Sequence, residues 1–590
     1  MNKFVSSMLG AFTGTWIAFL LSGILVMFFG VMMIVSMSAG GGMVANIDDN
    51  SVLCIDLSGN ITDRPYNKTL QDLLNGDVET GDNIHNILKA LKEAEENEKI
   101  KGVFITCSGS SMGPATARTL RNAIKDFKKN SKKWVLAYGH EITQADYYVA
   151  SVADEIYLNP VGALDIHGLT SAKMFYTGLL QKLGVEMQIF RVGTFKSAVE
   201  PYFRTDMSEA NRLQTQAYID NIWKQMVDDI AESRSVKANI ITEYADSLYA
   251  FSDAKIAKDM KLVTDLCYQH QVEEKIQKRL GVEKRDDINF VTTMTAANAG
   301  NVSMDSDNQI AVLYAEGDIV ESGIDGEICS NDLVPQIIAL AEEDEVKGLV
   351  LRVNSPGGSA FASEQIWEAI EYFKGKKKPV AVSMGDFAAS GGYYISSGAD
   401  CIFAEPTTIT GSIGIFGIVP CMQKLFNDHL GLTTDYATTT PNANMDIYHP
   451  LTQKQCDAFQ SSVNRGYETF TKRCANGRHI SQDSIKSIAE GRVWDGISAK
   501  RIGLVDELGS LNEAIVWVAK KAKVDTDYDV SYYPEYTPNF VDVMLNSSFD
   551  TAALRLDLGK PAIIDSQAEE LKKILRRDRL QCRMEYVVIL

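Results

Sequence analysis

The sequence lacks the features by which metalloproteins, disulfide-stabilised proteins and nucleic-acid-binding proteins are usually recognised. None of its nine cysteines belongs to a C-x-x-C pair, so the sequence predicts neither a metal site nor a disulfide framework. The net charge is −19 and no basic stripe is present, which argues against a protein that binds nucleic acid. The acidic balance is read as a contribution to solubility. We expect no metal and no cofactor.

Charged residues are absent from residue 4 to residue 47. Within this stretch residues 16–37 are nearly all apolar, and about 20 such residues span the hydrocarbon core of a bilayer. The alternative is a signal peptide cleaved after the small residues 38–42, but its apolar region would cover only about 7–15 residues. The sequence therefore predicts a short cytoplasmic segment at residues 1–10 and a transmembrane signal anchor at residues 11–38.

The orientation of this anchor is predicted from the few charges that flank it. Lys3 precedes it, and Asp48 and Asp49 follow it, so the positive-inside rule places the body of the protein outside the cytoplasm. The free cysteines fit a reducing compartment slightly better and therefore argue mildly in the opposite direction.

The chain does contain two similar copies of one domain, in tandem. Residues 100–108 resemble residues 346–354, and at the same offset of 246 the similarity continues to Gly168 in one copy and Gly414 in the other. Such periodic similarity defines the architecture before any local prediction is made. We expect a first repeat at residues 48–295, a second at 308–548 and a tail at 549–590.

Both repeats alternate apolar strands with amphipathic helices, which is typical of right-handed βαβ units and a mostly parallel sheet. The fold class is therefore α/β. Residues 289–307, rich in Thr, Ala, Asn and Ser, are predicted to link the repeats. The predicted elements, first copy before second, are strands at 52–61 and 311–319, helices at 84–95 and 333–342, strands ending at 108 and 354, helices at 115–128 and 363–373, and strands at 134–137 and 379–382.

A Gly-Gly turn follows the buried strand of the second repeat, within residues 354–359. Paired glycines let the backbone turn sharply and leave N–H groups pointing outward. Outward N–H groups are what an oxyanion hole requires, although the same sequence is compatible with a plain tight turn. In the first repeat this turn is degraded to residues 108–113.

Ser390 lies between an apolar strand and a helix, with small residues on both sides. A side chain at such a transition is accessible to substrate, which makes Ser390 a candidate nucleophile. A serine there could equally cap the following helix. The first repeat has Gln144 at the equivalent position, so only one copy carries the candidate.

A serine nucleophile needs a base, and none of the seven histidines lies in a motif that would place it beside Ser390. A buried, neutral lysine can take this role. Lys196 of the first repeat lies among small residues, and the matching region of the second repeat, 438–444, has no lysine. The alternative is that Lys196 faces solvent, as most lysines do.

Four motifs together resemble the long form of bacterial signal peptide peptidase A. They are residues 193–201, 354–359, 389–394 and 411–414, which read GTFKSAVEP, NSPGGS, ASGGYY and GSIG. They occur in the family's order, and the resemblance covers essentially the whole chain from the anchor through both repeats.

The resemblance implies tandem Clp-protease/crotonase-like repeats behind one transmembrane helix, and a membrane-anchored serine endopeptidase with a Ser-Lys dyad. Ser390 would be the nucleophile and Lys196 the general base, one from each repeat. Gly358 and the N–H of Gly391 would form the oxyanion hole, and Ser412 would orient the lysine. With half of the dyad supplied by each repeat, the first copy has no need of a serine or an intact Gly-Gly turn.

The resemblance also implies the partners and the location. The substrates would be apolar peptides, namely the signal peptides that remain after release from preproteins. The enzyme would be a homotetramer held in the inner membrane by residues 11–38 in contact with lipid, with its catalytic region on the periplasmic side. Two other classes stay open: a crotonase-type acyl-CoA enzyme, which would share the fold and the oxyanion turn, and a catalytically silent membrane scaffold.

Overall fold

The computed structural model describes Ser22 and residues 47–64, 82–299, 306–323, 326–535, 580–584 and 588–589. Apart from Ser22, the predicted anchor at residues 11–38 lies outside this part of the chain. Most of the predicted tail at residues 549–590 lies outside it too, since only residues 580–584 and 588–589 of the tail are described. No helix among the described residues is both long and apolar enough to cross a bilayer.

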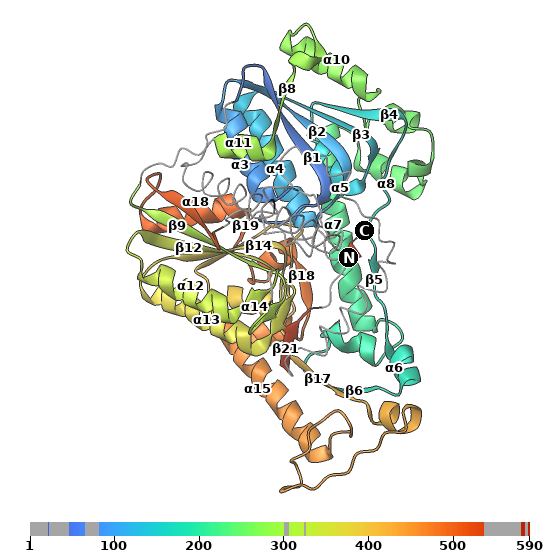
Figure 1. Ribbon diagram of the computed structural model, residues 1–590, viewed down its shortest axis with the longest axis vertical. Coiled ribbons are helices and arrows are strands. Elements are labelled where there is room, and N and C mark those ends of the chain that lie inside the picture. The colour runs from blue at the N-terminus through green and yellow to red at the C-terminus, as the bar shows by residue number, and fades with distance from the viewer. Residues whose placement is uncertain are drawn as a thin grey trace, which may run out of the picture.

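The first repeat is built on a six-stranded sheet in which every neighbouring pair is parallel. It forms the upper lobe in Figure 1. Its central strands are apolar on both faces, as expected of a parallel sheet covered by helices. In spatial order the strands are β7 (Asp265–Leu266), β4 (Glu155–Leu164), β3 (Trp134–Ile142), β2 (Ile100–Ser111), β1 (Ser51–Asn60) and β8 (Asn289–Thr292).

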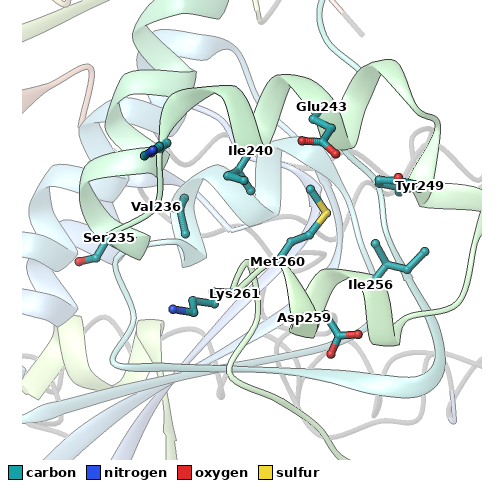
Figure 2. Close-up of a pocket in the computed structure, with 10 residues that line it drawn as sticks. Ser235, Val236, Ile240, Glu243, Tyr249, Ile256, Asp259, Met260 and Lys261 are labelled. Carbon is teal, nitrogen blue, oxygen red and sulfur yellow. The ribbon is translucent and has the colours of Figure 1, made fainter.

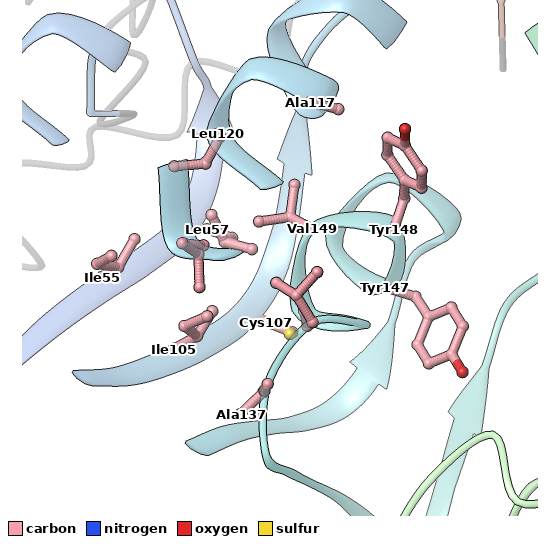
Figure 3. Packing of buried hydrophobic residues seen from close by; sticks show 14 of the residues in the cluster. Ile55, Leu57, Ile105, Cys107, Ala117, Leu120, Ala137, Tyr147, Tyr148 and Val149 are labelled. Atoms are coloured by element: carbon pink, nitrogen blue, oxygen red, sulfur yellow. The ribbon is translucent and has the colours of Figure 1, made fainter. Parts of the chain in front are cut away.

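Val272 and Ile276 pack against one face of this sheet, and most helices of the lobe close the larger core over the opposite face. Figure 3 shows Leu57, Ile105 and Leu120 packed together there with Tyr147 and Val149. The helices of the first repeat are α3 (Ile84–Glu96), α4 (Pro114–Ser131), α5 (Gln144–Ala150), α6 (Thr177–Leu183), α7 (Glu209–Arg234), α8 (Ala238–Asp246), α9 (Lys255–Asp259), α10 (Gln269–Leu280) and α11 (Thr293–Ala299).

The second repeat has a corresponding sheet in the lower lobe of Figure 1. Its strands run parallel except for β18, which is antiparallel to β16. The strands, in spatial order, are β18 (Val493–Asp495), β16 (Ile409–Gly411), β14 (Val380–Ala389), β12 (Val346–Ser355), β9 (Gln309–Glu316) and β20 (Asp529–Tyr533), with β15 (Cys401–Ala404) beside β14 and β19 (Glu507–Leu508) beside β15.

Helices cover this second sheet as well, and α15 extends from it toward the bottom of Figure 1. The α/β architecture with parallel sheets, predicted from the strand–helix alternation, is confirmed. The helices of the second repeat are α12 (Ser330–Glu342), α13 (Ala360–Gly375), α14 (Gly391–Ser396), α15 (Gln453–Arg478), α16 (Gln482–Ile488), α17 (Gly496–Arg501) and α18 (Leu511–Ala522).

The prediction of a linker at residues 289–307 was wrong for its first part. Asn289–Thr292 pairs with β1 as the edge strand β8, and Thr293–Ala299 continues as α11. The apolar residues of this segment bury against the first sheet, with Val291, Ala296 and Ala297 in its core. The polar composition of residues 289–299 therefore gave no sign of the short strand and helix that complete the first repeat.

Another sheet joins the two repeats and part of the tail. Its strands are, in order, β11 (Ile328–Cys329), β10 (Ile319–Val320), β13 (Gly357–Ser359), β21 (Leu580–Arg583), β17 (Phe416–Cys421) and β6 (Glu186–Arg191). Strand β6 belongs to the first repeat and pairs antiparallel with β17 of the second over six residues. The segment that follows β6 therefore begins beside the second repeat.

Buried polar contacts also tie the lobes together. Arg352 of β12 donates from Nη2 to Asp63 at 3.0 Å and from Nε at 3.1 Å, and both side chains are buried. Asp386 accepts hydrogen bonds from the N–H groups of Ala115 (2.7 Å) and Thr116 (3.1 Å) at the start of α4. A carboxylate at a helix N-terminus is favoured because the helix dipole is positive there.

Candidate active site

Ser390 occupies the sharp corner between β14 and α14. Its φ is 56° and its ψ is −112°, a conformation that costs free energy in any residue other than glycine. The Ser390 N–H donates to the Gly411 carbonyl at 2.8 Å. Although Ser390 is at the N-cap position, its side chain makes no capping hydrogen bond. The reading of this serine as an ordinary helix cap is therefore wrong.

Lys196 approaches the same point from the first repeat. Its Nζ donates to Ser390 Oγ at 2.7 Å, to Ser412 Oγ at 3.1 Å and to the Ser412 carbonyl at 3.2 Å. The lysine is 1% exposed and Ser390 is fully buried. The alternative of a solvent-facing lysine is therefore wrong, and these three residues form one hydrogen-bonded cluster.

Burial changes the acid–base character of this lysine. Removal from water lowers the pKa of Lys196 to about 8, because burial disfavours the charged form of an amine. The centroid of the Phe416 ring lies 5.9 Å from Nζ. A neutral amine is therefore accessible near physiological pH.

The backbone of Lys196 is held by a loop that precedes β18. The Phe195 N–H donates to the Glu490 carbonyl at 2.9 Å. Gly491 has φ +77°, and a Cβ at this position would lie 2.7 Å from the backbone N and Cα of Lys196. Because real Cβ atoms do not approach backbone atoms so closely, only glycine at position 491 leaves room for the backbone of Lys196. Gly491 could not be predicted from the sequence, because its partner lies in the other repeat.

Helix α7 fixes the lysine loop from its other side. Gln214 Nε2 donates to the Phe195 carbonyl at 3.1 Å, while its Oε1 accepts from the Val493 N–H at 3.1 Å. Two turns further along α7, Asn221 donates to Asp495 at 2.8 Å. These amide contacts couple the lysine-bearing segment to β18 of the second repeat, and no sequence motif predicts them.

The Gly-Gly turn lies directly against the start of α14. Gly357 has φ +106°, and a Cβ there would lie 2.7 Å from the Gly391 N atom. A Cβ on Gly358 would lie 2.0 Å from the Ile319 carbonyl oxygen. The turn is therefore packed backbone against backbone. The structure brings all five predicted site residues, including Ser412 and Lys196, into one region around Ser390.

The C-terminal tail also reaches this region, a contact that no motif in the sequence predicts. Ser390 Oγ donates to Cys582 Sγ at 3.3 Å, and Cys582 is fully buried. Burial raises the pKa of this thiol to about 11, so the group beside the serine is a neutral thiol at physiological pH.

The equivalent site of the first repeat is closed by hydrogen bonds. Gln144 Oε1 accepts from the N–H groups of His167 (3.0 Å) and Gly168 (2.9 Å). Asp146 accepts from the N–H groups of Gly109 (2.9 Å) and Ser110 (3.2 Å). The positions that match the serine and the oxyanion turn are thus filled by the chain itself, as the degraded motif suggested.

A surface pocket of about 650 Å³ lies elsewhere, between the end of α7, α8 and α9 (Figure 2). Charged residues of both signs and apolar side chains line it, and none of the five predicted site residues does. Its lining is Ser235, Val236, Lys237, Ile240, Glu243, Tyr249, Ile256, Asp259, Met260 and Lys261.

Comparison with known proteins gives the family. The sequence model of peptidase family S49 matches residues 127–283 and 372–525, and that of Clp protease matches residues 301–407. Protease 4 from Haemophilus influenzae is 35% identical over 91% of this chain and 91% of its own length. The chain belongs to peptidase family S49. Its two matched segments fall one in each repeat, so it is the long, two-domain form.

Other S49 relatives extend the similarity beyond one organism. Protease 4 from Salmonella typhi is 32% identical over 91% of this chain and 90% of its own length. The chloroplastic serine protease SPPA of Arabidopsis thaliana is 28% identical over 82% of this chain and 70% of its own length. As an S49 peptidase, the protein is a serine protease.

Proposed function

We propose that this S49 peptidase is a membrane-anchored endopeptidase that degrades remnant signal peptides, with Ser390 as nucleophile and Lys196 as general base. The observation that carries the proposal is the 2.7 Å contact between Lys196 Nζ and Ser390 Oγ inside a buried cluster. A nucleophile and a base within hydrogen-bond reach, with the base oriented by a third group, are the signature of covalent catalysis. Ser412 is that third group.

The reaction begins from neutral Lys196. Its amine takes the proton of Ser390 while Oγ attacks a peptide carbonyl. The N–H groups of Gly358 and Gly391 stabilise the tetrahedral oxyanion; loss of one such donor typically lowers the rate about 100- to 1000-fold. The Lys196 ammonium then protonates the leaving amine, and water hydrolyses the acyl-enzyme with the lysine again as base.

The remaining parts of the proposal concern substrate, assembly and location. An apolar peptide in extended form suits a site bordered by strand edges, because main-chain pairing supplies affinity without demanding a sequence. The apolar residues 11–38 support attachment to the inner membrane with the catalytic region on the periplasmic side. The homotetramer follows from the resemblance to the family.

The test uses the full chain in detergent with a synthetic signal peptide, and mass spectrometry reads the fragments. We expect cleavage by the unmodified protein and by neither Ser390→Ala nor Lys196→Ala. Cleavage that survives Lys196→Ala would assign the base elsewhere. If no form cleaves at any pH, and a serine-reactive probe does not label Ser390, the scaffold function would replace this one.

A further inference from the structure

One arginine outside the dyad contacts both repeats beside the lysine loop. Arg492 lies between α16 and the start of β18. Its Cζ lies over two aromatic rings, 5.0 Å from the centroid of the Phe195 ring and 4.2 Å from that of the Trp494 ring. Phe195 directly precedes Lys196 in the first repeat, whereas Trp494 belongs to β18 of the second. The side chain therefore joins the segment that carries the base to the repeat that carries the nucleophile.

The backbone around the same arginine holds the other side of the site. The Arg492 carbonyl accepts a hydrogen bond from the Ser412 N–H at 2.7 Å, and the Gly491 N–H donates to the Ile413 carbonyl at 2.9 Å. Ser412 is the residue whose Oγ and carbonyl accept hydrogen bonds from Lys196 Nζ. Arg492 thus fixes an acceptor of the lysine through its main chain and the neighbour of the lysine through its side chain.

The tryptophan that Arg492 contacts is itself part of the framework around the nucleophile. The indole N–H of Trp494 donates to the Ile488 carbonyl at 3.2 Å, and its strand, β18, pairs antiparallel with β16. Strand β16 ends at Gly411, whose carbonyl accepts the N–H of Ser390. The arginine is therefore anchored on the serine side of the site and reaches from there to the lysine loop.

Aromatic faces stabilise the charge of this arginine. The Nε of Arg492 is buried and has no hydrogen-bond partner among the described residues. Burial also lowers the pKa of the guanidinium, because removal from water disfavours the charged form. A cation that lies over aromatic rings recovers part of this cost, and the planar guanidinium makes such contacts better than an ammonium does. The contacts with Phe195 and Trp494 therefore account for a charge that burial disfavours.

We propose that Arg492 is a positioning residue for the general base, whose contact with the Phe195 ring holds Lys196 within reach of Ser390 and away from water. The proposal rests on the proposed function, in which Lys196 is the base. Because the guanidinium contacts the residue before the base, it acts through the lysine loop and not on the reacting atoms.

Loss of this contact has two consequences for the amine. The lysine loop would then be held by the main chain of Phe195, through Gln214 and Glu490, while the Phe195 ring is free to move. Fewer molecules would hold the Lys196 amine at hydrogen-bond distance from the serine, so kcat would fall. Water would also reach the amine more easily, which raises the pKa of Lys196 toward its ordinary value.

The first experiment measures kcat and KM of Arg492→Met, as the full chain in detergent, on a synthetic signal peptide at pH 7 and pH 9. Methionine keeps an unbranched side chain and the main-chain contacts but removes the planar cation. We expect kcat at pH 7 to fall about 10- to 30-fold with KM unchanged. In the unmodified protein kcat should rise about tenfold between the two pH values, since the pKa of Lys196 is about 8. In the variant the rise should be about 50-fold or more, as a pKa of about 9 or above requires.

The ratio of the two rates separates positioning from a merely structural role. Partial unfolding would lower kcat by the same factor at both pH values and leave the ratio at about ten. A normal kcat, or a lowered kcat with an unchanged ratio, would therefore overturn the proposal. Arg465→Ala is the matched control, since Arg465 lies exposed on α15 and donates to Ser461; its kcat and its ratio should equal those of the unmodified protein.

Phe195→Leu removes the other partner of the same contact, and it carries the test if Arg492→Met does not fold. It should show the same fall in kcat and the same steeper rise with pH. The double variant should be about as slow as Arg492→Met alone, because the two substitutions remove one contact. A loss equal to the product of the two single losses would show that the residues act independently and would overturn the proposal.

Lys196→Ala, measured alongside, distinguishes failure of this proposal from failure of the proposed function. If Lys196→Ala retains activity, the lysine is not the base and both fail. If Lys196→Ala is inactive while Arg492→Met and Phe195→Leu keep a normal kcat and a normal ratio, the dyad stands and the positioning role alone is refuted.

Discussion

Activity should depend on pH as the titration of Lys196 dictates. Burial lowers the pKa of this lysine to about 8 from its ordinary 10.5, so at pH 7 about one enzyme in ten carries the neutral amine, against about one in 3000 for an exposed lysine. Because only the neutral form accepts the Ser390 proton, kcat/KM should rise about tenfold per pH unit below pH 8 and level off above about pH 9.

The assay follows peptide cleavage by the full chain from pH 6 to 9.5, with thermal unfolding measured at each pH to separate loss of activity from loss of structure. Lys224→Ala is the matched control, since this lysine lies exposed on α7, where it pairs with Asp228; its profile should coincide with that of the unmodified protein. A flat profile across this range would refute the assignment of Lys196 as base. A rate that still rises about tenfold per pH unit at pH 9.5, as a midpoint near the ordinary 10.5 requires, would refute the argument from burial.

Three further predictions concern the surroundings of the dyad and the contact between repeats. Gly491→Ala should lower kcat about 100-fold by displacing Lys196, while circular dichroism shows a retained fold; near-normal kcat would contradict the close-approach argument. Ser412→Ala removes a hydrogen-bond acceptor of the ammonium, so the pH–rate midpoint should move down, and an upward shift would contradict this role. Asp63→Ala leaves Arg352 buried without its carboxylate and should lower the free energy of unfolding by about 3–5 kcal/mol, as urea denaturation can measure.

Much of the architecture could be predicted because the duplication allowed each element to be read twice. The strand at Val346–Ser355 and the helix at Ser330–Glu342 both occur close to their predicted positions, since apolar periodicity reports burial directly. Periodicity failed at Asn289–Thr292. That strand has four residues, and its place at the sheet edge comes from pairing with β1 rather than from its own composition.

The residues of the candidate site also fall into those that could be predicted from the sequence and those that could not. The local sequence predicts that Ser390 lies at a strand–helix corner. A nucleophile and a helix cap both occur at such a corner, so only a partner from the other repeat distinguishes the two roles. The role of that partner, Lys196, was predicted from the family motifs and not from the spacing of residues. Gly491 and Cys582 carry no local signal at all, because their importance arises from close approaches to residues far away in the sequence.

The way Lys196 is held has a consequence for the synthesis of the protein. Domains generally fold as units while the chain is being made, the N-terminal one first. The first repeat can therefore complete its sheet while it holds Lys196 but no serine equivalent to Ser390, and its own degenerate site is closed by Gln144 and Asp146. Proteolytic competence must wait until the ribosome has passed Gly491, whose loop receives the lysine. A partly synthesised chain therefore cannot cleave the proteins around it.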